Sequence, residues 1–233
     1  MQRLVIIKTG DTIPSLRALR GDFEDWILAG MGLETAQAEV VDVAAGQPLP
    51  QPTQAGGIVI TGSHDMVTDR LEWSEQTASW LSDAVAFGTP TLGICYGHQL
   101  LAHALGGRVD WNPRGKEMGT TSVTLLDAAF QDPLLGGLPA TIDVHLAHSQ
   151  SVLSLPPGAV HLAANPWDRY QAFRVGDCAW GVQFHPEFDA GIMRAYAAIE
   201  ESSPGAQIFD TPIGGEILKR FASLVHLETR EGR

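Results

Sequence analysis

The sequence predicts an α/β fold whose central sheet is mostly parallel and carries added antiparallel strands. As far as Gly106, short apolar runs alternate four times with amphipathic helical patterns, which is typical of parallel strands joined by crossover helices. Between residues 108 and 185 the pattern changes to short β-like runs separated by turns, and this change favours antiparallel or mixed strands added to the same sheet.

The elements of the parallel half begin with an apolar run over residues 3–9, which predicts the first strand. Apolar side chains spaced three and four apart over residues 15–31 predict the first helix. A helix also follows Cys95 directly and ends at Gly106. The other predicted elements of this half are strands at 39–43, 57–61 and 91–94 and a helix at 71–87.

The second half of the chain carries five β-like runs and two helical patterns. The β-like runs lie at 119–126, 141–147, 159–163, 170–175 and 179–184. The helical patterns cover 189–201 and 213–227, and we expect residues 228–233 to fray. Because no repeat or linker divides the chain, we predict one domain over residues 1–233, with 191–233 as its C-terminal helical segment.

Composition and charge exclude several classes of protein. The chain has 233 residues, 44% of them hydrophobic, and a formal net charge of −12 without any basic run. Nucleic-acid binding needs clustered Lys and Arg, so we expect no nucleic-acid partner. No run approaches the roughly 18 apolar residues of a membrane helix, and the N-terminal apolar stretch is too short for a signal peptide. We therefore expect a cytoplasmic protein without a membrane partner.

Cys95 stands at a sharp turn between a predicted strand and a predicted helix. Gly93 and Gly97 flank it at G-x-C-x-G spacing, and small neighbours permit the strained turn that presents a nucleophile at the top of a sheet. The helix that begins after Cys95 favours negative charge and therefore thiolate. The other cysteine, Cys178, forms no C-x-x-C pair with it. A buried structural cysteine is the alternative interpretation.

A candidate base and its orienting carboxylate follow another apolar strand pattern. His185 comes directly after the run that ends at Phe184, where the ligand crevice of an open α/β sheet forms. Glu187, two residues further on, is placed to orient the imidazole as in a nucleophile-histidine-carboxylate triad. The alternative for His185 is a core or surface histidine without a catalytic role.

Acyl chemistry also needs N–H donors for the developing oxyanion. The backbone N–H of Tyr96, just after Cys95, is one candidate. The turn containing Gly62 and Ser63 follows the strand at 57–61 and supplies a second candidate, because we expect that strand to lie beside the strand at 91–94.

The segment from Gly93 to Gly107, together with the segment Gly181–Phe188, closely resembles the class I glutamine amidotransferases of the triad type. The closest similarity is to stand-alone members that resemble the glutaminase domain of GMP synthase. The resemblance implies a flavodoxin-like three-layer α/β/α domain that hydrolyses glutamine through a γ-glutamyl thioester. It further implies that Cys95 is the nucleophile, His185 the general base and acid, and Glu187 the orienting carboxylate.

The resemblance extends to substrate-binding positions. Gln99 matches the glutamine that contacts substrate, and Ser149 and Gln150 lie in a stretch that matches the one holding the substrate α-amino and α-carboxylate groups. His148 lies close to the site by the same match, and we favour a structural role for it. One departure concerns the oxyanion turn, where Gly62-Ser63-His64 replaces the usual Gly-Gly-Pro.

Three functions stay open at this point. The first is a glutaminase whose ammonia acceptor lies on a separate synthetase subunit. The second is a γ-glutamyl peptidase or hydrolase with the same triad, for which a more open pocket at the Gly62–Asp69 loop and Trp167 would be the distinguishing feature. The third is a regulatory protein without activity, which the intact triad disfavours.

We expect no metal and no other cofactor, because the sequence has neither metal-ligand spacing nor a phosphate-binding loop. The oligomeric state stays open.

Overall fold

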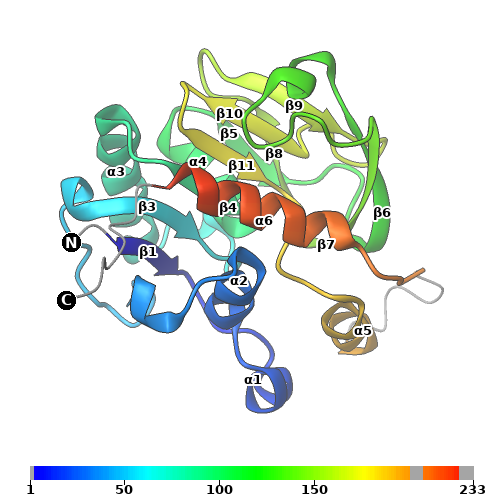
Figure 1. Ribbon diagram of the computed structural model, residues 1–233, viewed down its shortest axis with the longest axis horizontal. Helices are drawn as coiled ribbons and strands as arrows, with labels where there is room; N and C mark the ends of the chain where they lie inside the picture. The colour runs from blue at the N-terminus through cyan, green and yellow to red at the C-terminus, as the bar shows by residue number, and fades with distance from the viewer. Residues whose placement is uncertain (1–2, 200–206, 226–233) are drawn as a thin grey trace.

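A mixed sheet lies at the centre of the computed structural model, which describes residues 3–199 and 207–225 (Figure 1). In this part of the chain the sheet has nine strands in the order β2-β1-β3-β4-β11-β10-β9-β6-β7. Its parallel half consists of β2 (Ala38–Asp42), β1 (Arg3–Lys8), β3 (Ala55–Ile60), β4 (Thr91–Ile94) and β11 (Ala179–Val182). The predicted α/β class and the predicted pairing of the third and fourth strands are confirmed.

The antiparallel half continues the sheet beyond β11. Its strands are β10 (Ala172–Val175), β9 (Val160–Ala164), β6 (Glu117–Leu125) and β7 (Thr141–His148). A separate two-stranded sheet pairs β5 (Arg108–Trp111) with β8 (Gln150–Ser154), and the sequence did not predict either strand. Each finds its partner only in a distant part of the chain, so the local pattern of four or five residues carries little signal.

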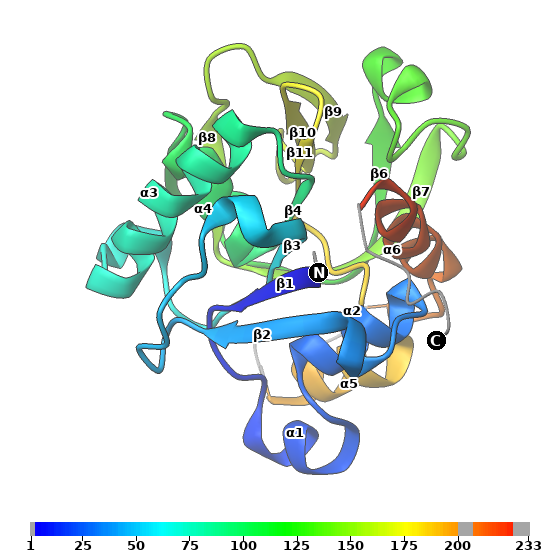
Figure 2. The same cartoon turned by 60° about the vertical axis from the view of Figure 1, so that its left-hand side comes forward.

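Helices cover both faces of the parallel half and give three layers (Figure 2). Alternate residues of β1 point to opposite faces. Leu4 and Ile6 pack with α2 (Phe23–Met31) and α6 (Pro212–Leu224), whereas Val5 and Ile7 pack on the face covered by α3 (Glu72–Phe87) and α4 (Tyr96–Ala104). The remaining long helix, α5 (Ala190–Ile199), contacts β6 and β7.

The prediction of one helix over residues 15–31 is wrong, because two helices occupy this segment. The first, α1 (Pro14–Arg20), ends at Gly21, whose φ of 82° lies in the left-handed region that glycine adopts readily. Asp22 then caps α2, and a capping box with Asp25 completes the new helix start. Asp22 also pairs with the buried Lys8 ammonium at 2.8 Å, so the break ties α2 to the end of β1.

The other helices agree with the predicted ranges to within a few residues. Predicted positions 200–201 and 226–227, and the tail at 228–233, lie outside the described residues. Short 3-10 turns occur at Thr35–Gln37, Pro52–Gln54, Val67–Asp69 and Asp127–Gln131. Within residues 3–199 and 207–225, no helix has the length and apolar character that crossing a membrane requires.

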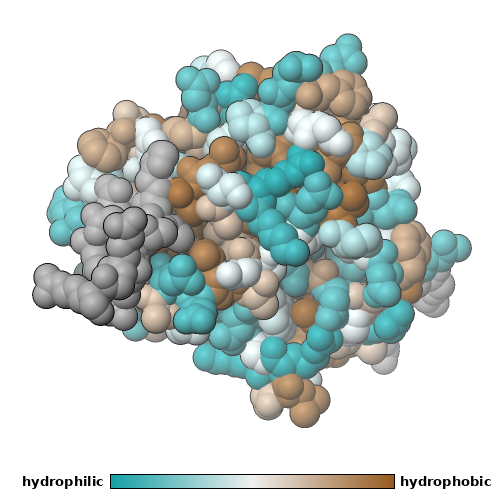
Figure 3. Space-filling model, in the orientation of Figure 1, coloured by the Kyte–Doolittle hydropathy of each residue, from teal (hydrophilic) through white to brown (hydrophobic). Residues whose placement is uncertain are grey.

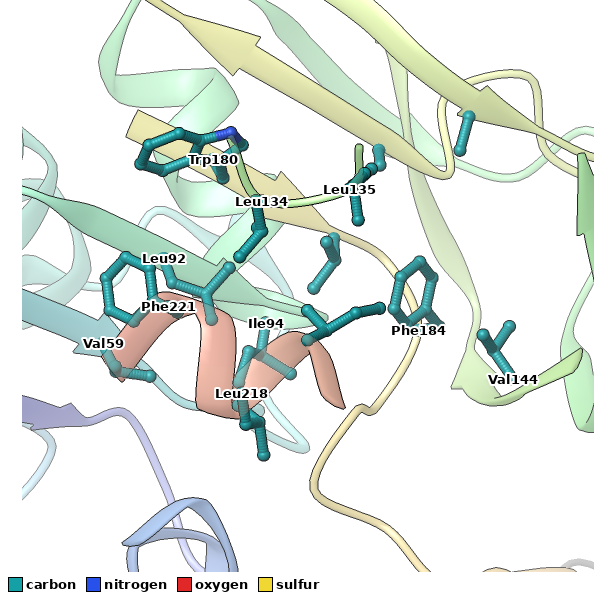
Figure 4. Packing of buried hydrophobic residues seen from close by; sticks show 14 of the residues in the cluster. Val59, Leu92, Ile94, Leu134, Leu135, Val144, Trp180, Phe184, Leu218 and Phe221 are labelled. Carbon is teal, nitrogen blue, oxygen red and sulfur yellow. The ribbon is translucent and has the colours of Figure 1, made fainter. Parts of the chain in front are cut away.

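Helix α6 lies across the sheet and closes its apolar core. Leu218 and Phe221 point into the core beside Val59 and Leu92 (Figure 4). The outward surface over this helix is largely hydrophilic (Figure 3), and Lys219 is exposed. At the start of α6, Gly214 packs on Pro186, and a Cβ at Gly214 would lie 2.5 Å from the Pro186 carbonyl oxygen. The contact therefore requires glycine.

Substitutions at two adjacent glycines of α6 test this contact. Gly214→Ala is expected to lower the free energy of unfolding by about 1–3 kcal/mol, because the new methyl group collides with backbone. Gly215→Ala is the matched control, since a Cβ at Gly215 meets no atom within 4 Å. It is expected to raise the free energy of unfolding by up to about 1 kcal/mol through helix propensity. Urea denaturation measures the free energy of unfolding of both variants. Equal effects of the two substitutions would contradict a specific contact between Gly214 and Pro186.

Candidate active site

Cys95 adopts a strained backbone conformation between β4 and α4. Its φ of 53° and ψ of −101° fall outside the regions that side-chain-bearing residues favour. The flanking glycines make this turn possible: a Cβ at Gly93 would lie 2.4 Å from the Gly97 carbonyl oxygen, and one at Gly97 would lie 2.5 Å from the Ile60 carbonyl oxygen. The strand-turn-helix elbow predicted from G-x-C-x-G spacing is therefore present.

The strand that precedes His185 lies directly beside the strand that precedes Cys95. β11 and β4 pair in parallel, and the Cys95 N–H donates to the Val182 carbonyl oxygen at 2.9 Å. His185 and Cys95 are close enough for their side chains to interact. His185 Nδ1 lies 2.8 Å from Glu187 Oε1, so Nε2 is the ring nitrogen that remains for the thiol. The three residues predicted as a triad thus come together.

Charge around the buried His185 favours its protonated form. Burial alone lowers the pKa of the imidazole, but the Glu187 carboxylate and the Cys95 thiol outweigh burial and raise this pKa to about 10. A protonated imidazole beside a thiol stabilises the thiolate, the reactive form of cysteine. The site therefore places a cationic imidazole beside the candidate nucleophile Cys95.

Hydrogen bonds fix the turn that was predicted to supply an oxyanion donor. The Thr9 hydroxyl lies 3.1 Å from the Thr61 carbonyl oxygen and 3.0 Å from the Gly62 carbonyl oxygen, and it donates into this region. Among the described residues, no backbone carbonyl accepts a hydrogen bond from the N–H of Ser63. Tyr96 is the first residue of α4, and the first N–H groups of a helix lack partners within it. Both N–H groups belong to residues that line one cavity with Cys95.

That cavity has a volume of about 170 Å³. It is lined by Ser63, His64, Asp65, Met66, Cys95, Tyr96, Gln99, Lys116, Ala147, His148, Ser149 and Gln150. The predicted binding residues Gln99, Ser149 and Gln150 all belong to this wall. Gly62 lies just behind it, where a Cβ would be 3.1 Å from His185 Cε1. Within the described residues, no cluster of His, Cys, Asp and Glu is arranged to hold a metal ion.

Gln99 is held in place by its amide nitrogen. Gln99 Nε2 donates to the Gln150 carbonyl oxygen at 2.8 Å and to Gln183 Oε1 at 3.0 Å. These bonds connect α4 to β8, which contributes Gln150 to the cavity wall, and to Gln183, which directly follows β11. The amide orientation is thereby fixed before any substrate enters.

Glu117 organises a buried polar network beneath the cavity. Its carboxylate accepts hydrogen bonds from Asn165 at 2.6 Å and from Gln171 at 3.0 Å, and it lies 3.0 Å from His148 Nε2. The other ring nitrogen of His148 lies 2.8 Å from the Gln150 carbonyl oxygen. Both nitrogens are thus engaged within the protein, in agreement with the structural role predicted for His148.

Two residues near the site were not singled out from the sequence. Thr9 directly follows β1 and fixes the Gly62 turn, but an isolated threonine after a strand gives no recognisable signal. Phe188 stacks on the His185 ring with 4.0 Å between ring centroids and 16° between ring planes. Its position directly after His-Pro-Glu is the only clue in the sequence.

Comparison with known proteins agrees with this geometry. Residues 22–198 match the family described as Glutamine amidotransferase class-I. The chain therefore belongs to the class I glutamine amidotransferase family. Its fold also resembles the crystal structure of a glutamine amido transferase from Methylobacillus flagellatus, with a TM-score of 0.77 and 22% identity over 100% of this chain and 99% of that one.

The chain is similar to GMP synthases and to a gamma-glutamyl peptidase. GMP synthase [glutamine-hydrolyzing] of Aeropyrum pernix is 37% identical over 68% of this chain, which spans only 28% of that protein's length. A GMP synthase [glutamine-hydrolyzing] subunit of Methanopyrus kandleri is 32% identical over 73% of this chain and 76% of that protein. Gamma-glutamyl peptidase 3 of Arabidopsis thaliana is 31% identical over 59% of this chain and 56% of that protein.

Selective alkylation tests the state of Cys95. Iodoacetamide at pH 7 is expected to label Cys95 before Cys178, although Cys178 is the more exposed thiol. Burial and the neighbouring Asp177 raise the pKa of Cys178, whereas Cys95 lies beside the positive charge of the protonated His185. Because thiolate is the reactive form of cysteine, a neighbouring cation speeds alkylation. Peptide mapping by mass spectrometry gives the two rates, with Cys178→Ser as the control. Faster labelling of Cys178 would contradict this effect of His185 on Cys95.

Proposed function

We propose that this chain hydrolyses the side-chain amide of glutamine through a γ-glutamyl thioester on Cys95. The observation that carries the proposal is the strained Cys95 elbow beside the buried His185–Glu187 pair, in a chain of the class I glutamine amidotransferase family. The products are glutamate and ammonia, and the reaction requires no metal or other cofactor. The enzyme is accordingly a cysteine-dependent hydrolase of an amide bond.

In the first half of the proposed reaction, the Cys95 thiolate attacks the γ-carbonyl carbon of glutamine. The backbone N–H groups of Ser63 and Tyr96 stabilise the resulting oxyanion, and each such donor contributes about 3 kcal/mol in comparable sites. The His185 imidazolium then gives its proton to the amide nitrogen as the carbon–nitrogen bond breaks. Ammonia leaves, and the γ-glutamyl group stays on Cys95 as a thioester.

In the second half, His185 acts as the base. The neutral imidazole removes a proton from water, and the resulting hydroxide attacks the thioester carbonyl. Collapse of the tetrahedral intermediate releases glutamate and returns the thiolate. Glu187 keeps Nδ1 protonated and oriented throughout, as the carboxylate does in related triads.

The cavity supports a small substrate. Its volume of about 170 Å³ is below the several hundred Å³ typical of sites for larger ligands. Gln99, Ser149 and Gln150 line the wall and are proposed to hold the amino-acid end of glutamine. An open pocket formed by the Gly62–Asp69 loop and Trp167 would distinguish a γ-glutamyl peptidase, but Trp167 lines a different cavity.

A separate synthetase chain is proposed to accept the ammonia. The relative from Methanopyrus kandleri is named as one subunit of a GMP synthase, and this chain covers 76% of it. The described residues form an amidotransferase fold. The reaction that consumes the ammonia would then take place on a partner chain. We propose that this assembly is cytoplasmic and binds neither nucleic acid nor membrane.

The alternative function is hydrolysis of γ-glutamyl amides or peptides. It rests on the similarity to gamma-glutamyl peptidase 3 of Arabidopsis thaliana. The same Cys95 attack would then release an amine larger than ammonia. The small cavity favours glutamine over these substrates.

Turnover of the purified chain tests both functions. Glutamate release from glutamine is expected for the wild type, alone or with a synthetase partner, and Cys95→Ala is expected to lower it by at least about 10³-fold because the nucleophile is lost. Cys178→Ser serves as the control and is expected to retain activity. A panel of γ-glutamyl amides and dipeptides is measured in parallel. A preference for these compounds would favour the peptidase, and no cleavage of any γ-glutamyl compound would refute both functions.

The pH dependence of turnover tests the role of Glu187. In the proposed mechanism protonated His185 donates to the leaving group, so kcat/KM falls as pH rises through the raised pKa of His185, about 10. Glu187→Gln removes a charge that raises this pKa, and the basic limb is therefore expected to move to lower pH. Glu39→Gln, an exposed change on β2, is the control. If the basic limb of the kcat/KM profile stays at the same pH in Glu187→Gln, the proposed role of Glu187 is refuted.

A further inference from the structure

We propose that Phe188 is a positioning residue whose ring fixes the plane of the His185 imidazole, so that Nε2 stays aligned with Cys95. This inference rests on the function proposed above. It concerns a side chain that does not line the cavity and takes no part in proton transfer.

The stack on His185 supplies a restraint that the hydrogen bond to Glu187 lacks. One bond at Nδ1, 2.8 Å long, holds one atom of the ring and leaves the ring able to tilt about that contact. Phe188 lies face to face with the imidazole, with centroids 4.0 Å apart and planes 16° apart. A tilt would break this contact across the whole face, so the ring plane is fixed.

Phe188 is itself held rigidly by aromatic neighbours from two helices. Trp26 of α2 meets its ring edge-on at 5.6 Å, and Tyr196 of α5 packs at 5.0 Å. Trp26 Nε1 donates to the Arg20 carbonyl oxygen at 2.8 Å, and the Tyr196 hydroxyl lies 2.8 Å from Thr12 Oγ1. Because both neighbours are anchored by hydrogen bonds, Phe188 transmits their fixed position to His185.

Phe23 and Gly62 complete the surroundings of the imidazole. The Phe23 centroid lies 6.3 Å from both His185 and Phe188, with its ring nearly parallel to each, so it lies beside the stacked pair. Gly62 faces the Cε1 edge, where a Cβ would approach to 3.1 Å. One face and one edge of the ring are therefore in contact with residues whose shape leaves little room for rotation.

The stack also has an electrostatic effect. A cation over the face of an aromatic ring is attracted by the negative charge of that face. The protonated imidazole therefore gains from Phe188, in the same direction as its gain from Glu187. Losing the ring would loosen the orientation of His185 and make its proton easier to lose.

Substitutions that keep or remove the ring test the proposal. Phe188→Leu keeps an apolar side chain without the ring and is expected to lower kcat about tenfold, with KM changed less than twofold and the basic limb of the pH profile moved to lower pH. Phe188→Tyr keeps the ring and is expected to retain kcat within about threefold. Phe221→Leu is the matched control, because it makes the same change at a buried position in α6, away from His185.

Alkylation of Cys95 by iodoacetamide as a function of pH provides a second measurement that needs no substrate. Phe188→Leu is expected to shift this profile relative to the wild type, whereas Phe221→Leu leaves it in place. Unchanged kinetics and an unchanged alkylation profile in Phe188→Leu would overturn the proposal, as would equal losses in Phe221→Leu. Absence of turnover in the wild type would refute the proposed function alone, because the alkylation profiles would still decide the role of Phe188.

Discussion

The parallel pairing of β4 with β11 is the interaction on which the site depends. It places the Cys95 turn and the His185 turn at the same edge of the sheet, although they lie far apart in the chain. The hydrogen bond from Cys95 N–H to the Val182 carbonyl oxygen fixes their separation. Each turn is then secured from its own side: Gly93 and Gly97 make room for the strained cysteine, and Gly214 of α6 packs on Pro186. Without this strand pairing, the Cys95 turn and the His185 turn would not lie next to each other.

Burial determines the electrostatic state of the site as much as proximity does. His185 and Glu187 are both removed from solvent, so their mutual interaction is weakly screened, and together with the interaction between His185 and Cys95 it outweighs the desolvation of the imidazole. The aromatic residues around Phe188 exclude water from the same region and hold the ring in one plane. On the other side, the Glu117 carboxylate accepts a hydrogen bond from Asn165 and contacts His148, which lines the cavity. Hydrogen bonds and ring contacts therefore support the site on both sides.

Much of this arrangement could be predicted from the sequence because its signals are local. The alternation of apolar runs and helical periods predicted the parallel half, and G-x-C-x-G at a strand end predicted the elbow. The two-residue separation of His185 and Glu187 predicted their contact, which needs only a turn of the chain. The prediction of one helix over 15–31 was wrong because two local signals conflict there. The apolar periodicity continues across Gly21, and it is a stronger signal than the capping residues that divide the segment into two helices.

The sequence by itself determined the fold class, the elbow and the candidate catalytic side chains, because strand periodicity, glycine requirements and short-range spacing can be recognised in neighbouring residues. Only the tertiary structure decided how these parts are supported. The pairing of β5 with β8, the bonds from Thr9 to the Gly62 turn, the Phe188 stack and the Gly214–Pro186 contact are meetings of side chains and backbone from separate elements. Such contacts depend on the register and packing of the whole sheet, and no local pattern encodes them.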